Sequence, residues 1–220
     1  MTPEDLAAVV PRVYHLTAPD AVAGIRARGL FTPETICERL GLPDGERERL
    51  LTRRRLTEVR LEGDVGGGRE TYVVNDNAPL FTDKLAAVLQ DGLAPADWLA
   101  MLNARVFFWA DERFARSLRA ARNNRDRSRT LLVLDTLSLA RAHGERMELC
   151  PINSGATLHT PPPRGLLTFS ALPGLRYDAW RRARRERGEK KGLDKIKEVT
   201  VRGDVPDAWD HVVEVIDDPA

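Results

Sequence analysis

The stretch RVYHLT at residues 12–17 sets the expected fold class of this chain. Its valine, tyrosine, leucine and threonine are typical of a β-strand. Residues 19–28 follow directly and place Ala21, Val22 and Ile25 on one helical face. Gly29 is then expected to end this helix. A short strand that leads into a short helix predicts a fold containing both element types.

The same interleaving continues toward the C-terminus. Apolar and β-branched runs predict further strands at residues 58–61, 70–75, 105–110, 130–135, 197–202 and 211–216. Helical periodicity predicts helices at residues 34–42, 44–51, 81–90, 95–103 and 111–122, the last with Asp111 as its N-cap. The glycines at 66–68 predict a hairpin loop rather than a phosphate-binding loop. Short strands and irregular connections favour the α+β class.

Length and composition exclude several classes of protein. The chain has 220 residues, 42% hydrophobic and 30% charged, as in a globular domain. It contains no run of the ~18 apolar residues that a spanning helix needs, so we expect no membrane segment. An acidic N-terminal stretch without a signal-peptide pattern predicts a cytoplasmic protein. Two cysteines, Cys37 and Cys150, are expected to be buried, reduced thiols.

The charges nearly cancel but are unevenly placed. Lys plus Arg is 34 and Asp plus Glu is 33, for a net charge of +1. Residues 112–129 carry seven Arg against two acids, and residues 176–197 carry ten Lys or Arg against four acids. These segments are either solvated helix faces or surfaces for a polyanion such as DNA or RNA.

Common catalytic signatures are missing from the sequence. It has no GxxxxGK[ST] loop, no GxSxG elbow and no HExxH motif. The four histidines have no second His or acid at a spacing that we interpret as a metal site, so no metal is predicted.

Four features remain as candidate ligand contacts, although each also has a purely structural interpretation. Strand alternation places His15 and Thr17 on one face and Tyr14 on the other. The aromatic run Phe107, Phe108 and Trp109 forms either core or a surface for a planar ring. Asn153 and Ser154 lie in a polar turn. Glu198 is a carboxylate on a predicted strand.

The order of these features resembles the ADP-ribosyltransferase fold. RVYHLT, a short helix and IRARGLF at 25–31 look like its opening, where a strand bearing a His and a polar residue precedes a helix ending in Gly-Leu. VFFWADERFARSL at 106–118 and TLLVLDT at 130–136 continue the order. KEVTVRGDVPDAWDHVVEVI at 197–216 is similar to the strand, loop and final strand that supply the family's catalytic glutamate. The resemblance is greatest to DarT-like DNA ADP-ribosyltransferases and related uncharacterised bacterial proteins.

The resemblance implies one domain over residues 1–220, built on a split β-sheet core with a helical insertion around 32–103. It implies NAD+ as co-substrate and Glu198 as the catalytic glutamate. His15 and Thr17 would contact the ribose and the nicotinamide amide with Tyr14 on the opposite side, and a ring among Phe107, Phe108 and Trp109 would stack on nicotinamide. Arg55 matches the region in which the family places an important Arg. Asn153 and Ser154 are added as cofactor-binding candidates, although residues 151–169 have no counterpart in the family.

The acceptor of ADP-ribose stays open at this point. The resemblance and the two basic segments suggest a DNA base or other nucleic acid, and a role as a toxin. One alternative is a non-enzymatic module that binds nucleic acid or a partner on the same fold. Another is an NAD+-dependent RNA 2′-phosphotransferase, because those enzymes share this fold.

Overall fold

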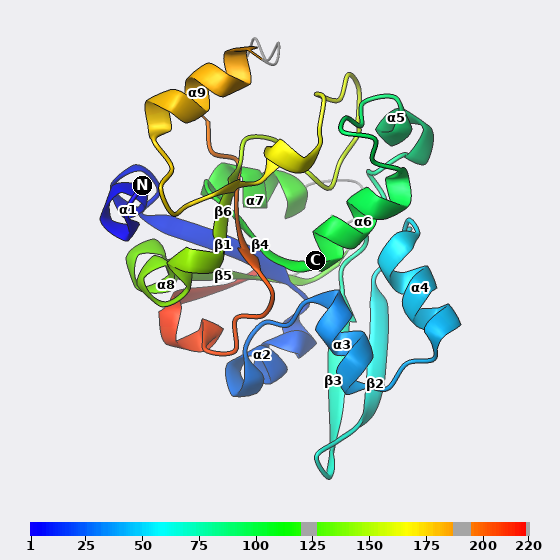
Figure 1. Cartoon of the computed structure of the whole chain (residues 1–220). Helices are drawn as coiled ribbons and strands as arrows, with labels where there is room; N and C mark the ends of the chain where they lie inside the picture. Colours follow the sequence, from blue (N-terminus) through cyan, green and yellow to red (C-terminus); the bar gives the residue numbers. More distant parts are fainter. Residues whose placement is uncertain (120–126, 187–194, 219–220) are drawn as a thin grey trace.

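A large antiparallel sheet organises the molecule (Figure 1). The computed structural model describes residues 1–119, 127–186 and 195–218. Seven strands pair in the order β7-β6-β8-β4-β1-β5-β9. They are β1 Arg12–Thr17, β4 Arg105–Trp109, β5 Arg129–Asp135, β6 Met147–Cys150, β7 Ser170–Ala171, β8 Glu198–Arg202 and β9 Val212–Asp218. Helices accompany this sheet, so the mixed fold expected from the sequence is confirmed.

Helices precede, connect and flank the strands. They are α1 Pro3–Val9, α2 Val22–Arg28, α3 Pro33–Arg39, α4 Asp44–Thr52, α5 Thr82–Ala86, α6 Pro95–Asn103, α7 Glu112–Arg119, α8 Thr136–His143 and α9 Tyr177–Glu186. Four short 3-10 helices are η1 Pro19–Ala21, η2 Gly144–Arg146, η3 Leu166–Thr168 and η4 Ala208–His211. Asp111 caps α7 as expected, because its carboxylate accepts from the backbone N–H of Arg113 at 2.8 Å. None of the described helices combines the length and apolarity that crossing a bilayer requires.

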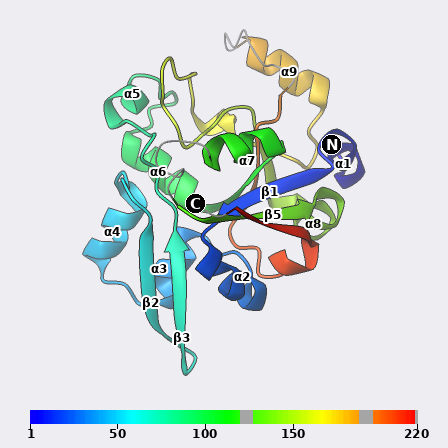
Figure 2. The ribbon, with the colours of Figure 1, turned by 180° about the vertical axis from the view of Figure 1, so that it is seen from behind.

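The sheet buries residues on both faces. Val13 of β1 belongs to the main core, which α8 supplies with Leu139 and Ala140. On the opposite face, Leu16 packs with Ala115 of α7, and α7 lies over β1 (Figure 2). Tyr14 joins the α7 side, so the side chains of β1 alternate as the sequence predicts. β6 and α8 were not predicted; β6 has only four residues, all of them buried, including Glu148.

The backbone pairing between β1 and β4 is much less extensive than the pairing of either strand with its other neighbour. β1 pairs with β5 along its whole length, from Arg12 opposite Asp135 to Thr17 opposite Thr130. β4 pairs with β8 along all of its residues. Between β1 and β4, only Tyr14 and Trp109 are paired in the described sheet. The centre of the sheet is therefore held together by one backbone pair and by side chains.

The insertion at 32–103 contains more than helices. Besides α3 to α6, it holds the hairpin of β2 Val59–Val65 and β3 Gly68–Val74, close to two of the predicted strands and at one side of the main sheet (Figure 1). Gly66 and Gly67 form its turn with φ of 59° and 86°, conformations that glycine adopts without strain. The insertion contributes to two further apolar clusters: Cys37 belongs to one within the insertion, and Cys150 joins residues of α5 and α6 in the other. Both thiols are buried and unpaired, as expected.

Gly29 brings the end of α2 against the loop between β8 and β9. Its φ is 87°, and a Cβ at this position would overlap the backbone of Pro206. The next residue, Leu30, exchanges backbone hydrogen bonds of 2.9 and 2.8 Å with Val205. The Gly-Leu stop of this helix therefore has a packing reason as well as a conformational one.

Candidate functional site

A cavity of about 860 Å³ opens at the weakly joined centre of the sheet. Its walls come from the end of β1, from α2, from β3 and the segment that follows it, from β4, and from the turn at 153–156. Pockets that hold small ligands and cofactors span roughly 300–1,000 Å³. The cavity is therefore large enough for a dinucleotide-sized ligand.

Nine of the ten predicted site residues line this cavity: His15, Thr17, Arg55, Phe107, Phe108, Trp109, Asn153, Ser154 and Glu198. They come from five separate parts of the chain. Tyr14 is the exception: it packs in the cluster under α7 and does not line the cavity. The structure thus brings together residues that the sequence could only order along the chain.

Glu198 lies at the start of β8 with only 4% of its surface exposed. The backbone N–H of Ser154 donates to both of its oxygens, at 3.1 and 3.3 Å. Burial raises the pKa of Glu198 to about 7, although the hydrogen bonds from Ser154 act in the opposite direction. A carboxyl group with such a pKa can both exist as an anion and exchange a proton near neutral pH.

His15 bridges the two weakly joined strands. Its Nδ1 lies 3.0 Å from the carbonyl oxygen of Phe107, which can only accept, so Nδ1 carries the proton. Burial lowers the pKa of His15, and the ring is therefore neutral at pH 7. Nε2 then has a free lone pair, with no bonding partner among the described residues. This nitrogen can accept a hydrogen bond from a ligand.

The aromatic strand divides into core and cavity wall. Phe108 is 1% exposed and packs edge-on to His15, with ring centroids 5.9 Å apart. Phe107 and Trp109 are half-buried, and their rings contact Phe169 and Phe114. Of the three predicted aromatic residues, Phe107 and Trp109 are thus better placed than Phe108 to offer a ring to a ligand.

Arg55 lines the cavity but is occupied by protein acceptors. It donates to the carbonyl oxygens of Asn75 at 3.1 Å and Leu50 at 2.5 Å, and to the side chain of Asn103 at 3.1 Å. Burial lowers its pKa to about 10, so the guanidinium remains charged. These contacts fix the cavity wall, and a ligand-binding role for Arg55 stays a prediction.

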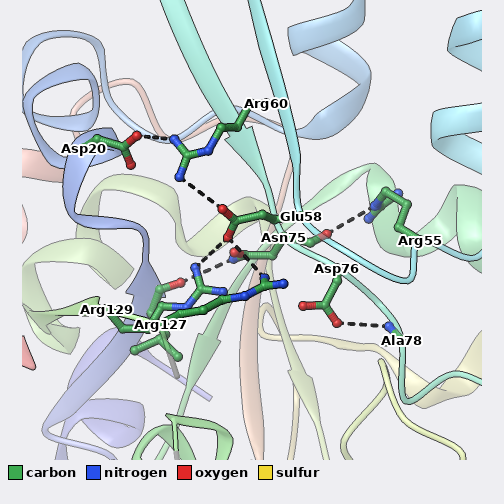
Figure 3. A network of polar contacts seen from close by, with 10 residues as sticks. Asp20, Arg55, Glu58, Arg60, Asn75, Asp76, Ala78, Arg127 and Arg129 are labelled. Atoms are coloured by element: carbon green, nitrogen blue, oxygen red, sulfur yellow. Dashed lines mark hydrogen bonds and ion pairs between the residues drawn. The ribbon is translucent and has the colours of Figure 1, made fainter. Parts of the chain in front are cut away.

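A network of polar contacts ties this wall to the sheet (Figure 3). Glu58 accepts from Arg60 and Arg129 at 3.0 Å each and lies 3.6 Å from Arg127. Asn75 donates to the carbonyl oxygen of Leu16 at 3.3 Å, which satisfies a β1 oxygen beside the opening. The cavity wall is therefore fixed to both β1 and β5.

A family model matches residues 11–212 of the chain and is described as a family of unknown function, DUF7002. The chain belongs to the DUF7002 family. The matched region contains every residue that lines the cavity, from His15 to Glu198. No curated protein and no solved structure matches the chain. The function of this DUF7002 protein must therefore be argued from its site.

The two basic segments of the DUF7002 protein differ in how their charges are used. In residues 112–129, the described Arg113, Arg116, Arg127 and Arg129 each form an ion pair with a carboxylate, and residues 120–126 lie outside the described part. In residues 176–197, Arg184 is buried with its guanidinium 4.6 Å from the Trp180 ring. Arg176, Arg182 and Arg185 are exposed, while residues 187–194 lie outside the described part. Among the described residues, only the second segment offers exposed arginines without a carboxylate partner.

One side-chain cluster was not predicted from the sequence, because no acid was recognised at a metal-binding spacing from a histidine. His143 at the end of α8 lies close to Asp207 and to His211 of η4, and the possible ligand atoms of the three residues are all within 4.8 Å of one another. His143 Nε2 lies 2.6 Å from Asp207, while Arg146 donates to His143 Nδ1 at 2.9 Å. Because Arg146 can only donate, the proton of a neutral His143 is on Nε2, where it bonds Asp207. That arrangement leaves no lone pair on Nε2 for a metal and favours a structural hydrogen-bond network.

Proposed function

We propose that this protein is an NAD+-dependent ADP-ribosyltransferase with Glu198 as its catalytic residue. The observation that carries the proposal is the convergence of His15, the aromatic strand and Glu198 on one cavity. These elements resemble the ADP-ribosyltransferase order along the chain, and the single pairing between β1 and β4 is in keeping with the split core that the resemblance implies. The shifted pKa of a buried acid in a cavity is typical of an active site and argues against a purely binding module.

Glu198 would act on the ribose next to nicotinamide. When the bond between the ribose C1′ and the nicotinamide nitrogen breaks, the bonding electron pair leaves with nicotinamide and C1′ becomes positively charged. A carboxylate bonded to the 2′-hydroxyl stabilises that charge more strongly in the transition state than in the ground state. The acceptor nucleophile then bonds C1′ and releases its proton, which Glu198 can accept.

The other cavity residues would orient NAD+. His15 Nε2 would accept a hydrogen bond from a ribose hydroxyl or from the nicotinamide amide, a role that requires the neutral ring found here. Thr17 lies two residues along the same strand and would contact the same region. Phe107 or Trp109 would stack against the nicotinamide ring. Asn153 adds an amide beside Ser154 at the Glu198 end of the cavity.

For the acceptor we propose a nucleic acid bound by the exposed arginines of α9. Arg176 directly precedes α9, and Arg182 and Arg185 lie on it; among the described residues none of the three has a carboxylate partner, so they can approach phosphate groups. Affinity for single-stranded DNA or RNA should then fall steeply as salt increases. An affinity that is the same at low and high salt would instead favour a protein or small-molecule acceptor.

The decisive experiment measures nicotinamide release from NAD+ by the purified chain, with and without oligonucleotides. Glu198→Ala should abolish release while the protein remains folded. Glu214→Ala, which removes an exposed carboxylate on β9, is the matched control and should behave as the wild type. Full turnover by Glu198→Ala would refute the assignment. A thermal shift with NAD+ but no turnover by the wild type would favour the binding module.

A further inference from the structure

Arg164 is a fully buried charge without a carboxylate partner. Its residue surface is 1% exposed, and no carboxylate of the described residues lies within ion-pair distance. Charged side chains are almost never buried to this degree unless they are paired. The position of this guanidinium therefore needs an explanation.

The hydrogen bonds of Arg164 lead to the Ser154 turn. Nη1 donates to the carbonyl oxygen of Ser154 at 3.0 Å, and Nε lies 3.4 Å from the carbonyl oxygen of Pro162. Nη2 is buried and has no hydrogen-bond partner within the described part of the chain. Trp98 of α6 donates to the same Ser154 oxygen at 3.2 Å, and its ring lies 5.7 Å from the guanidinium. Two buried donors thus hold one carbonyl group.

Ser154 connects this pair of donors to the proposed catalytic acid. Its carbonyl oxygen accepts hydrogen bonds from Trp98 and Arg164, while its N–H donates to both oxygens of Glu198. The backbone of Arg164 is itself fixed by two hydrogen bonds. Its N–H donates to the carbonyl oxygen of Val88 at 2.9 Å, and its carbonyl oxygen accepts from the N–H of Gln90 at 2.8 Å. Hydrogen bonds through Arg164 and Ser154 therefore connect the insertion to Glu198.

We propose that Arg164 is a positioning residue for Glu198, which holds the Ser154 turn in place and stabilises the ionised carboxylate with its buried positive charge. The catalytic importance of this role rests on the proposed function, but the physical coupling does not. It also assigns a task to residues 151–169 and to α6, for which the family resemblance offers no counterpart.

The charges around Glu198 support this coupling. Burial lowers the pKa of Arg164 to about 10, and interactions with Cys150 and Glu198 act in the opposite direction. Arg164 is therefore positively charged at neutral pH. Cys150 faces Glu198 from β6, and burial raises the pKa of its thiol well above the usual value, so it stays neutral. Lys197 adds a second positive charge next to Glu198 in the chain.

The test follows the titration of the Glu198 carboxyl carbon by NMR in selectively ¹³C-labelled protein, with the signal assigned by its loss in Glu198→Gln. The variants are Arg164→Met, which removes charge and donor, Arg164→Gln, which keeps a donor, and Arg164→Lys, which keeps the charge. Arg146→Gln is the control, since Arg146 also donates to backbone carbonyls but at Arg202 and Asp204. Removing the positive charge that interacts with Glu198 should move the Glu198 midpoint upward, by about one pH unit.

We expect Arg164→Met and Arg164→Gln to raise the midpoint, and Arg164→Lys and Arg146→Gln to leave it close to the wild-type value. A folded Arg164→Met or Arg164→Gln protein with the wild-type midpoint overturns the proposal. If neither neutral variant folds, the proposal requires that Arg164→Lys folds and keeps the wild-type midpoint. If Arg164→Lys also fails to fold or has a different midpoint, the role of Arg164 is in folding alone. Because the titration needs no substrate, a shifted midpoint in a protein that never cleaves NAD+ would refute the proposed function and leave the coupling intact.

Discussion

The backbone N–H of Ser154 donates to both carboxylate oxygens of Glu198, across 44 residues of sequence. The contact is possible because β6 and β8 pair with Cys150 opposite Glu198, so the chain leaving β6 turns back over the start of β8. A single amide donor in a buried setting only partly offsets the cost of ionising the acid. This balance leads to the first two predictions below.

The first prediction concerns the pH dependence of nicotinamide release. Glu198 must be ionised to stabilise positive charge on the ribose, and its pKa in the free protein is about 7. The value of kcat/KM should therefore rise about tenfold per pH unit below pH 7 and level off above it. Bound NAD+ brings a positively charged ring close to Glu198, so the midpoint for kcat should lie at lower pH. A rate that is constant from pH 5 to 8 would contradict this role for Glu198.

The second prediction concerns the free energy of unfolding. A folded-state pKa raised from 4.5 to about 7 means that protonated Glu198 favours the folded state. This contribution is fully present below about pH 4.5 and is lost as the pH rises through 7. Glu198→Gln removes the titration and should stabilise the protein by up to about 3 kcal/mol above pH 8.

The measurement is chemical denaturation of the wild type and Glu198→Gln at pH 5 and pH 8.5. At pH 5 the two proteins should differ by less than about 1 kcal/mol. If the wild type and Glu198→Gln are equally stable at pH 5 and also at pH 8.5, burial does not disfavour the ionised form of Glu198. Because both proteins share all other titrating groups, the difference between them isolates Glu198.

The third prediction distinguishes the roles of the two ring nitrogens of His15. Asn can replace the Nδ1 donor to Phe107, whereas Gln reaches the position of Nε2. His15→Asn should retain stability better than His15→Ala, by about 1 kcal/mol for the bridging hydrogen bond. It should nevertheless bind NAD+ as poorly as His15→Ala. Thermal denaturation and NAD+ titration measure the two effects, and unchanged NAD+ affinity in His15→Asn would remove His15 from the ligand contacts.

The fourth prediction tests whether Arg55 is structural. Its guanidinium donates to Leu50, Asn75 and Asn103, so Arg55→Ala should leave buried acceptors unpaired and cost about 2–4 kcal/mol of stability. Arg54→Ala is the matched comparison, since the neighbouring Arg54 lines the same cavity and stacks 4.3 Å from the Phe81 ring. If Arg55→Ala keeps full stability but loses NAD+ affinity, Arg55 is instead a ligand contact, as the resemblance implied.

Much of the local structure could be predicted because it depends on neighbours in the chain. The bounds of α6 agree with the predicted helix at 95–103, and Asp111 caps α7 as expected. The hairpin turn at Gly66 and Gly67 follows from the conformations that glycine tolerates. β6 was missed because it has only four residues and includes Glu148, a charged residue that is buried through its ion pair with the distant Arg105.

By itself, the sequence determined the order of most strands and helices, the turn glycines, and the four chemical features that mark a candidate site. Only the tertiary structure decided that these features share one cavity, that Arg55 is occupied by protein acceptors, and that Arg164 and Glu198 both bond the backbone of Ser154. It also brought His143 to Asp207, 64 residues away. The physical reason is that helix and strand periodicity is local, whereas the pKa of a buried acid depends on strand register and on residues distant in sequence.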